Sequence, residues 1–394
     1  MHQIFYRLTI CFFSFIAFQA QAGYTTFQFD GLTRQYIYYA PANLPSNAPL
    51  LFVLHGFGGS GSGWNGYFNT LASQNKFAVC YPDGQLYANN GGVTVCQWNT
   101  RYEADYEQKG MKNDITFLDS LAKYLQQKYR LDPTKTFVTG HSNGADMCFM
   151  LASESQGVFK AAAPSAGTMM NTEITTYCTQ PGIPLYCIHA VEDPVSWYDG
   201  DQTGTQNYGL YRGSWWCFNN VFKQKLGLDI CDSINLPDIN TTDNCTVTTF
   251  RYRSSFNKNE SWYYRVNGSG GQHNYNEGSL DFSPSDSVWK FFQRYIDTRT
   301  GTASIGNSGQ VEAKSDQQFA IGQFLNGKLD LTLPLAGRYK LAVCGIDGVV
   351  VAKIAGENVI NGLCRVSLRI PPGVYLASLR GDGNFAVKKI QVFR

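Results

Sequence analysis

The sequence predicts an α/β protein with a mostly parallel sheet covered by helices on both faces, followed by a small all-β domain. Two patterns support this prediction. Up to about residue 300, short apolar runs alternate with segments of helical periodicity, which is typical of a parallel sheet. After that point only strand-like alternation is seen. The length of 394 residues suits two domains, and 43% hydrophobic residues suffice for a large core.

The N-terminal residues 1–22 have the pattern of an export signal. Arg7 precedes the apolar run 8–18, and residues 20–22 (Ala-Gln-Ala) form a small-residue cleavage site. The run is too short to span a bilayer, and no later stretch reaches that length. We therefore expect a mature chain that starts at Gly23 and is secreted, in solution or attached to a cell surface. The alternative is a buried N-terminal helix.

The predicted elements of the first domain, residues 23–300, follow from local patterns. Residues 24–41 alternate and contain the turn dipeptide Asp30-Gly31, which predicts a hairpin. Continuous apolar runs predict buried strands, and periods of three and four residues predict amphipathic helices. The expected strands are 49–54, 77–81, 136–139 and 183–188, and the expected helices are 114–129, 144–152 and 285–295.

The C-terminal part reads differently. Residues 301–309 are rich in Gly, Ser and Thr, so we interpret 301–327 as a linker and the approach to a second domain. Residues 328–394 alternate between apolar and polar positions, with turn signals at 347–348 and 381–383. A β-domain of this size is helped by a disulfide, and Cys344 and Cys364 are its only cysteines. We therefore predict that these two cysteines pair.

The remaining cysteines and the charges narrow the function classes. Ten cysteines stay after removal of the signal, and an even number in an exported chain favours disulfides. Cys80–Cys96 is a second candidate pair, whereas Cys148 fits a buried free thiol as well as a bridge. No spacing indicates a metal site or a cofactor. With 32 basic and 30 acidic residues and no basic stripe, we expect no nucleic-acid partner.

A G-x-S-x-G motif, Gly140 to Gly144, lies between the expected strand 136–139 and the helix 144–152. A serine on such a strand–turn–helix junction projects above the sheet, and glycines are needed on both sides because the turn is tight. We predict Ser142 as a nucleophile. The backbone N–H of Asn143, at the start of the helix, is expected to stabilise the oxyanion.

A second oxyanion donor is expected from a loop that follows an earlier strand. The glycine-rich loop 55–59 leaves the strand 49–54 at the expected place, and the backbone N–H of Phe57 is the candidate. An ordinary glycine-rich turn is the alternative interpretation.

The general base follows by elimination, because the sequence contains only five histidines. His2 lies in the signal, His55 opens the oxyanion loop, and His141 adjoins the serine so that its side chain diverges. His189 ends a buried strand and fits a core residue. His273, in a loop before the last helix, is therefore the predicted base, although a surface-loop histidine would look similar.

The acid that orients the base should follow a strand and lie between the serine and the histidine in the sequence. Asp193 meets both conditions, since it follows the strand 183–188. Glu192 is its rival, and Asp201 is a weaker one.

The segment from about 29 to 295 resembles the secreted polyhydroxybutyrate-depolymerase-like esterases, which include the feruloyl and acetyl xylan esterases of carbohydrate esterase family one. The resemblance covers 54–56 (Leu-His-Gly), 81–84 (Tyr-Pro-Asp-Gly), 96–99 (Cys-Gln-Trp-Asn), 114–118, the elbow 140–144, 189–195, and His273 with 288–292. In the family pattern the H-x-x-x-D aspartate falls on Asp193. The histidine of G-H-x-W-P falls on His273, but Gln272 and Tyr275 replace the glycine and the tryptophan, and Ala145 replaces a second elbow glycine.

The resemblance implies an α/β-hydrolase fold and a serine carboxylic-ester hydrolase acting through an acyl-enzyme. Feruloyl or acetyl esters of plant polysaccharides are the expected substrates, with Trp98, Trp197 and Tyr275 as candidate substrate contacts. The alternatives are a polyester depolymerase, a peptidase, or a binding protein that keeps the fold. The β-domain resembles C-terminal sorting domains that engage a secretion machinery or the cell surface, and a carbohydrate-binding module is the competing interpretation.

Overall fold

The computed structural model describes residues 23–88, 94–101, 110–155, 157–178, 180–206, 209–255, 257–268, 272–273 and 281–296 of the first part. In the second part it describes 320–325, 328–333, 337–345, 350–359, 362–367, 371, 373–381 and 384–392. The chain divides into two compact units, Met1–Ser304 and Ile305–Arg394, which are treated separately below. The expected signal at 1–22 and linker residues 301–319 lie outside the described residues.

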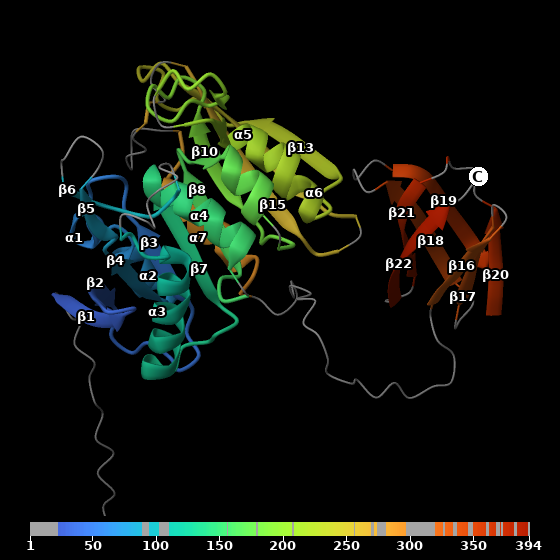
Figure 1. Cartoon of the computed structure of the whole chain (residues 1–394), viewed down its shortest axis with the longest axis horizontal. Coiled ribbons are helices and arrows are strands. Elements are labelled where there is room, and N and C mark those ends of the chain that lie inside the picture. Colours follow the sequence, from blue (N-terminus) through green and yellow to red (C-terminus); the bar gives the residue numbers. More distant parts are fainter. Residues whose placement is uncertain are drawn as a thin grey trace, which may run out of the picture. The chain divides into compact units, whose positions relative to one another are not determined.

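The first unit is built on a ten-stranded sheet with the order β1-β2-β4-β3-β7-β8-β10-β15-β14-β13 (Figure 1). The six central strands, β4 to β15 in this order, are parallel, and the strands toward both edges are antiparallel. The strands are β1 (Tyr24–Phe29), β2 (Leu32–Tyr39), β3 (Leu50–Leu54), β4 (Ala78–Pro82), β7 (Thr136–His141), β8 (Ala161–Ser165), β10 (Tyr186–Ala190), β13 (Ile230–Asn235), β14 (Thr246–Arg253) and β15 (Glu260–Asn267).

Helices cover both faces of this sheet, as β3 illustrates. All five of its side chains are buried. Leu50, Phe52 and Leu54 belong to one core cluster, which also contains the apolar faces of α3 (Asp114–Tyr129) and α4 (Asn143–Glu154). Leu51 and Val53 belong to a second cluster, formed with α2 (Asn69–Asn75) and α7 (Pro284–Gln293). The continuous apolar run is therefore buried on both sides, which confirms the predicted fold class.

Local signals place the ends of these elements. The first hairpin turns at Asp30 and Gly31, which both have positive φ (46° and 76°), as a tight two-residue turn requires. The Asn113 side chain accepts a hydrogen bond from the Thr116 N–H and so caps α3. Ser283 caps α7 in the same way, through the Asp286 N–H. The helices predicted at 114–129, 144–152 and 285–295 correspond to α3, α4 and α7.

Several strands differ from the prediction or were not predicted. The strand expected at 183–188 is β10, shifted to Tyr186–Ala190, and β8, β13, β14 and β15 were not predicted at all. The shorter elements are α1 (Gly61–Trp64), β5 (Gln85–Ala88), β6 (Thr94–Gln97), β9 (Thr168–Met170), β11 (Gly200–Asp201), β12 (Tyr211–Gly213), α5 (Ser214–Cys217), α6 (Lys223–Lys225) and two π-helical turns, Glu173–Tyr177 and Phe218–Phe222.

The second unit is an all-β domain with two antiparallel sheets. One sheet contains β16 (Ala320–Leu325), β17 (Lys328–Leu333) and β20 (Gly362–Ser367), and the other contains β19 (Val350–Val359), β18 (Gly337–Gly345), β21 (Gly373–Gly381) and β22 (Asn384–Val392). The first described strand starts at Ala320 rather than at 328. Cys344 lies in β18 and Cys364 in β20, so the two cysteines belong to different sheets of one unit. Their pairing stays a prediction.

The Cys80–Cys96 disulfide prediction is wrong for this structure. All eight cysteines described in the first unit are free thiols, and Cys148 is one of them. The Cys80 side chain is fully buried in a core cluster, whereas the Cys96 Sγ lies 3.5 Å from the His55 Nε2. Burial raises the pKa of the Cys80 and Cys148 thiols well above their ordinary value, so both stay protonated. Among the described helices, none combines the length and apolarity needed to cross a membrane.

Candidate active site

Ser142 occupies a strained turn between β7 and α4. Its φ of 54° and ψ of −123° are unusual for a residue other than glycine, and its N–H donates to the Ser165 carbonyl at 3.0 Å. Ser142 is followed directly by Asn143, the first residue of α4, so the positive end of the helix faces the serine. The predicted strand–turn–helix junction is therefore present.

Backbone contacts explain the two glycines of the motif. A Cβ on Gly140 would lie 2.4 Å from the Gly144 carbonyl oxygen, and a Cβ on Gly144 would lie 2.4 Å from the Leu54 carbonyl oxygen. Neither backbone atom can move without disturbing a central strand or the helix. Only glycine fits at both positions, which brings α4 against the carboxyl end of β3.

His273 and Asp193 are 80 positions apart in the sequence and lie in contact in the structure. The His273 Nδ1 lies 2.8 Å from one carboxylate oxygen of Asp193 and 3.0 Å from the other, and the Asp193 side chain is fully buried. The Val195 and Ser196 N–H groups donate to Asp193 Oδ1 at 2.8 and 2.9 Å. The histidine is thereby directed by a carboxylate that is itself held by its own turn.

The electrostatics of Asp193 favour the ionised form. Burial by itself would raise the pKa of Asp193, but hydrogen bonds with His189 and His273 outweigh it and lower the pKa below the ordinary range. The rival acids do not take this place. Glu192 is exposed, and Asp201 is buried but accepts hydrogen bonds from Thr203, Gly204 and Gln206 of its own loop.

His141, the residue before Ser142, holds the backbone of His273. Its Nε2 lies 2.6 Å from the His273 carbonyl oxygen, which can only accept, so the ring nitrogen donates. The two imidazole rings are 4.8 Å apart. Burial lowers the pKa of His141 to about 4. This neutral histidine therefore connects His273 to the turn that carries Ser142.

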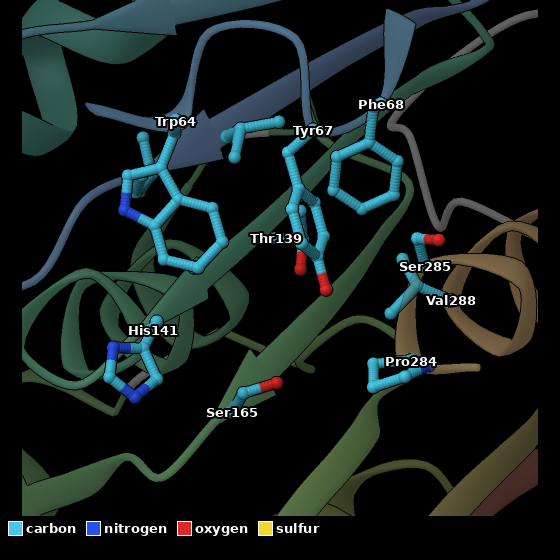
Figure 2. A pocket seen from close by; sticks show the side chains of 12 residues that line it. Trp64, Tyr67, Phe68, Thr139, His141, Ser165, Pro284, Ser285 and Val288 are labelled. Atoms are coloured by element: carbon cyan, nitrogen blue, oxygen red, sulfur yellow. The ribbon is translucent and has the colours of Figure 1, made fainter. Parts of the chain in front are cut away.

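The His141 ring also lines a small cavity behind the elbow (Figure 2). Trp64 and Tyr67 lie on the other side of the cavity, and Ser165 and Val288 line it further along. With a volume of about 30 Å³ it is far smaller than the several hundred Å³ of a typical ligand pocket. This cavity is part of the packing around His141 and is too small for an ester substrate.

The glycine-rich loop lies directly against the serine. A Cβ on Gly56 would lie 3.3 Å from the Ser142 Cβ, so the backbone of residues 56 and 57 passes beside Ser142. The Gly58 N–H donates to the Cys96 carbonyl at 2.9 Å. The Phe57 side chain is 53% exposed. Its backbone is thus fixed by its neighbours while its ring faces solvent.

Buried side chains brace this part of the site, and one of them, His55, is expected from the sequence to brace the loop that it opens. His55 is fully buried: the Gly84 N–H donates to its Nε2 at 2.9 Å, and its Nδ1 donates to the Gly56 carbonyl at 2.7 Å. Burial lowers the pKa of His55, in keeping with a neutral ring. The Asn143 side chain accepts from the Trp98 N–H at 2.8 Å and donates to the Thr100 hydroxyl at 2.9 Å.

The three residues predicted to contact substrate have different outcomes in the structure. The prediction for Trp98 is wrong, because this side chain is fully buried and donates to the His55 carbonyl at 2.9 Å. It braces the oxyanion loop instead. Trp197 is half-buried, four residues after Asp193, and its contact with substrate stays a prediction. Tyr275 lies outside the described residues. Within the described part of the chain, no group of three or more His, Cys, Asp or Glu side chains could hold a metal ion.

Parts of this chain are similar to known proteins. The phospholipase/carboxylesterase family matches residues 41–204. An acetylxylan esterase of Coprinopsis cinerea is 33% identical over 181 residues, which cover 45% of this chain and 46% of the relative. Poly(3-hydroxyalkanoate) depolymerase C of Paucimonas lemoignei is 29% identical over 181 residues, covering 43% and 39%. The match therefore spans less than half the length of each of these relatives.

Among solved structures, the acetyl xylan esterase from Aspergillus awamori aligns over 66% of this chain and 94% of its own, with 18% identity and a TM-score of 0.44. The described residues show the strand order of this fold. They also show the serine turn with a glycine on each side of the motif. The first unit has an α/β-hydrolase fold, and its residues 41–204 match the phospholipase/carboxylesterase family.

Proposed function

We propose that the protein is a serine esterase in which Ser142 is the nucleophile, His273 the general base and Asp193 the acid that orients the base. The observation that carries this proposal is the hydrogen bond between His273 and the buried Asp193, which His141 connects to the Ser142 turn. A carboxylate–imidazole pair next to an elbow serine is the arrangement that activates a hydroxyl for acyl transfer.

The chemistry follows from the roles of the three side chains. His273 Nε2 removes the proton from the Ser142 hydroxyl as its oxygen attacks the ester carbonyl, and Asp193 stabilises the imidazolium that forms. The same proton then goes to the leaving alcohol, which departs and leaves an acyl group on Ser142. Water, deprotonated by His273, attacks the acyl-enzyme and releases the carboxylic acid and the free serine.

The backbone N–H groups of Asn143 and Phe57 would stabilise the oxyanion in both tetrahedral intermediates. Asn143 supplies the N-terminus of α4, and the close approach of Gly56 to Ser142 supports a role for the adjacent Phe57 amide. The braces from Trp98 and His55 hold these amides before substrate arrives, so little reorganisation accompanies the reaction.

Covalent labelling tests this proposal. A fluorophosphonate should modify Ser142 in the wild-type protein, and Ser142→Ala should lose both the label and nearly all activity on a soluble aryl acetate. The fold is not expected to change, because alanine fills the same space. Full activity of Ser142→Ala would exclude the proposed mechanism. Labelling of a different serine would show that this other residue is the nucleophile.

For the substrate, we propose acetyl or feruloyl esters of plant cell-wall polysaccharides. Similarity to an acetylxylan esterase and, at 30% identity over 139 residues, to feruloyl esterase B of Talaromyces stipitatus supports this choice. The polyhydroxyalkanoate depolymerase relative favours a polyester as the second candidate. Initial rates on acetylated xylan, feruloylated arabinoxylan and hydroxybutyrate oligomers distinguish the three, since the preferred ester should give the highest kcat/KM.

We also propose that the protein is exported and that the second unit serves sorting, surface attachment or polymer binding. The N-terminal pattern of residues 1–22 supports export, and the all-β second unit is separate from the catalytic residues. N-terminal sequencing of the mature protein should begin at Gly23.

A further inference from the structure

A buried chain of hydrogen-bonding groups lies behind Asp193, on the side away from His273. It starts at His189, the fourth residue of β10, whose side chain is fully buried. The His189 Nε2 lies 2.7 Å from the Ser196 carbonyl oxygen and 3.5 Å from Asp193 Oδ2. The His189 Nδ1 lies 2.5 Å from the Ser214 hydroxyl, which in turn lies 2.7 Å from the Tyr263 hydroxyl.

The acceptors at one end of this hydrogen-bonded series fix where its hydrogen atoms lie. The Ser196 carbonyl and the Asp193 carboxylate only accept, so the His189 Nε2 must carry a hydrogen. In a neutral ring, Nδ1 then has a lone pair and accepts the single hydrogen of Ser214. The Ser214 oxygen is left to accept from the Tyr263 O–H. The three bonds therefore run from Tyr263 through Ser214 and His189 to the Ser196 carbonyl, and the protonated Nε2 also lies 3.5 Å from Asp193 Oδ2.

His189 also fixes the turn that holds Asp193. The Ser196 N–H donates to Asp193 Oδ1, while the Ser196 carbonyl accepts from His189. The turn 193–196 is thus tied to the carboxylate through the amide of Ser196 and to the rigid strand β10 through its carbonyl. If the His189 donor were lost, the Ser196 carbonyl would be left without this bond and the turn would lose its anchor to the sheet.

We propose that His189 is a positioning residue for ester hydrolysis: held by Ser214 and Tyr263, it anchors the turn 193–196 and keeps Asp193 directed at His273. This inference rests on the proposed function, because it assigns a task to a residue behind the same triad. His189 does not reach the serine or the substrate side and acts only through Asp193. It completes a line of side chains that runs from Tyr263, inside the sheet, to the base.

Three variants test the inference after fluorophosphonate labelling has established Ser142 as the nucleophile in the wild-type protein. His189→Leu fills a similar volume but cannot donate, and its kcat on an aryl acetate should fall about 10- to 100-fold, as for other residues that orient site ligands. KM should stay near the wild-type value. His189→Gln retains an N–H donor and should recover most of the lost kcat. Cys187→Ala, two residues earlier on the same face of β10, is the matched control and should keep the wild-type kcat.

A spectroscopic measurement separates positioning from general damage to the fold. The far-downfield proton resonance of the His273–Asp193 hydrogen bond should be weakened or shifted in His189→Leu and restored in His189→Gln. It should not change in Cys187→Ala, even if that variant melts at a lower temperature. The inference is overturned if folded His189→Leu keeps the wild-type kcat and resonance, or if Cys187→Ala loses kcat to the same degree.

If His189→Leu does not fold, Ser214→Ala decides. This variant leaves the imidazole in place but removes the hydroxyl that donates to Nδ1, and kcat should fall several-fold without a change in KM. An unchanged kcat and proton resonance in folded Ser214→Ala would overturn the inference. Absence of Ser142 labelling in the wild-type protein would instead contradict the proposed function, so the two failures are distinguishable.

Discussion

At the scale of single residues, the candidate site depends on the hydrogen bonds that the two carboxylate oxygen atoms of Asp193 accept. Two backbone amides and the His273 ring surround the carboxylate, and the His189 ring lies behind it. The two amides and the His273 Nδ1 donate to the carboxylate, and the His189 Nε2 lies 3.5 Å from it. A side chain that itself donates a hydrogen could not take the place of the carboxylate without turning one of these contacts into a clash of two donors.

The first prediction concerns this carboxylate. Asp193→Asn should lower kcat by roughly four orders of magnitude, because an amide group leaves His273 in the wrong tautomer to accept the serine proton. Glu192→Gln is the matched control: its side chain is exposed next to Asp193 and its loss should change kcat less than twofold. Steady-state rates on an aryl acetate measure both. A larger effect of Glu192→Gln than of Asp193→Asn would show that Glu192, and not Asp193, is the acid that orients His273.

The second prediction concerns His141 and the stability of the fold against acid. Burial lowers the pKa of this histidine from 6.5 to about 4, so the folded protein binds its proton less readily than the unfolded chain does. Stability should therefore fall as the pH drops from 6.5 to 4 and should change no further from this cause below 4. At 1.36 kcal/mol per pH unit, the contribution is about 3 kcal/mol at most.

The comparison variant for this prediction is His141→Gln, which keeps a donor for the His273 carbonyl but does not titrate. The free energy of unfolding, measured by urea at several pH values, should depend less on pH in the variant than in the wild-type protein. Burial also lowers the pKa of His55, which adds a slope of the same sign to both proteins. Only the difference between them reports on His141, and identical slopes would contradict the prediction.

At the scale of elements, the site is produced where the strand β7 turns into the helix α4. The close approach of Gly144 to β3 presses the helix N-terminus against the sheet, and this places the Asn143 amide beside Ser142. The turn at Ser142 therefore depends on the close packing of α4 against β3 and β7 as well as on its own sequence motif. Its two glycines are required by backbone atoms of neighbouring elements rather than by the substrate.

The third prediction follows from this packing. Gly144→Ala would place a methyl group 2.4 Å from the Leu54 carbonyl oxygen, and the helix would have to shift by about 1 Å. We expect a strong loss of kcat, with a melting temperature several degrees lower. Gly63→Ala is the control, because a Cβ there meets no atom closer than 3.8 Å and the residue lies in a short helix. Equal effects of the two changes on kcat would contradict the packing argument.

Much of the fold could be predicted where burial leaves a mark on the sequence. The strand β3 is apolar at every position because helices cover both its faces, and the apolar positions of α3 repeat at helical spacing. The strand β8 was missed because it reads Ala-Ala-Ala-Pro-Ser. Its three alanines are buried, but alanine has little strand propensity, so this strand leaves only a weak mark on the sequence.

The candidate site shows the same division. The turn at Ser142 could be predicted from the glycine-flanked motif, and the pairing of His273 with Asp193 from sequence order. The contacts of Asn143 with Trp98 and of His189 with Ser214 join residues that are distant in the sequence, and no local pattern encodes them. Trp98 was misassigned for this reason: a tryptophan near a site looks the same whether it braces a loop or contacts substrate.

At the scale of the whole molecule, the three residues proposed to be catalytic and the small β-domain belong to different compact units. Ser142, Asp193 and His273 lie in Met1–Ser304, and strands β16 to β22 lie in Ile305–Arg394. The second unit contains no histidine, so it cannot supply a general base of that type. Each unit has its own buried apolar side chains, which is the usual condition for independent folding.

The fourth prediction is that the second unit is dispensable for chemistry on small esters. A chain ending at Ser304 should fold and hydrolyse a soluble aryl acetate at close to the full-length rate. Insoluble polymer distinguishes the roles proposed for the second unit: a binding module would make truncation lower polymer activity alone, whereas a sorting domain would leave both activities intact and abolish export or surface attachment. Soluble activity, polymer activity and the amount of exported protein are measured side by side. Loss of the soluble activity, or an unfolded truncated chain, would show that the two units share a core and that the boundary at Ser304 is wrong.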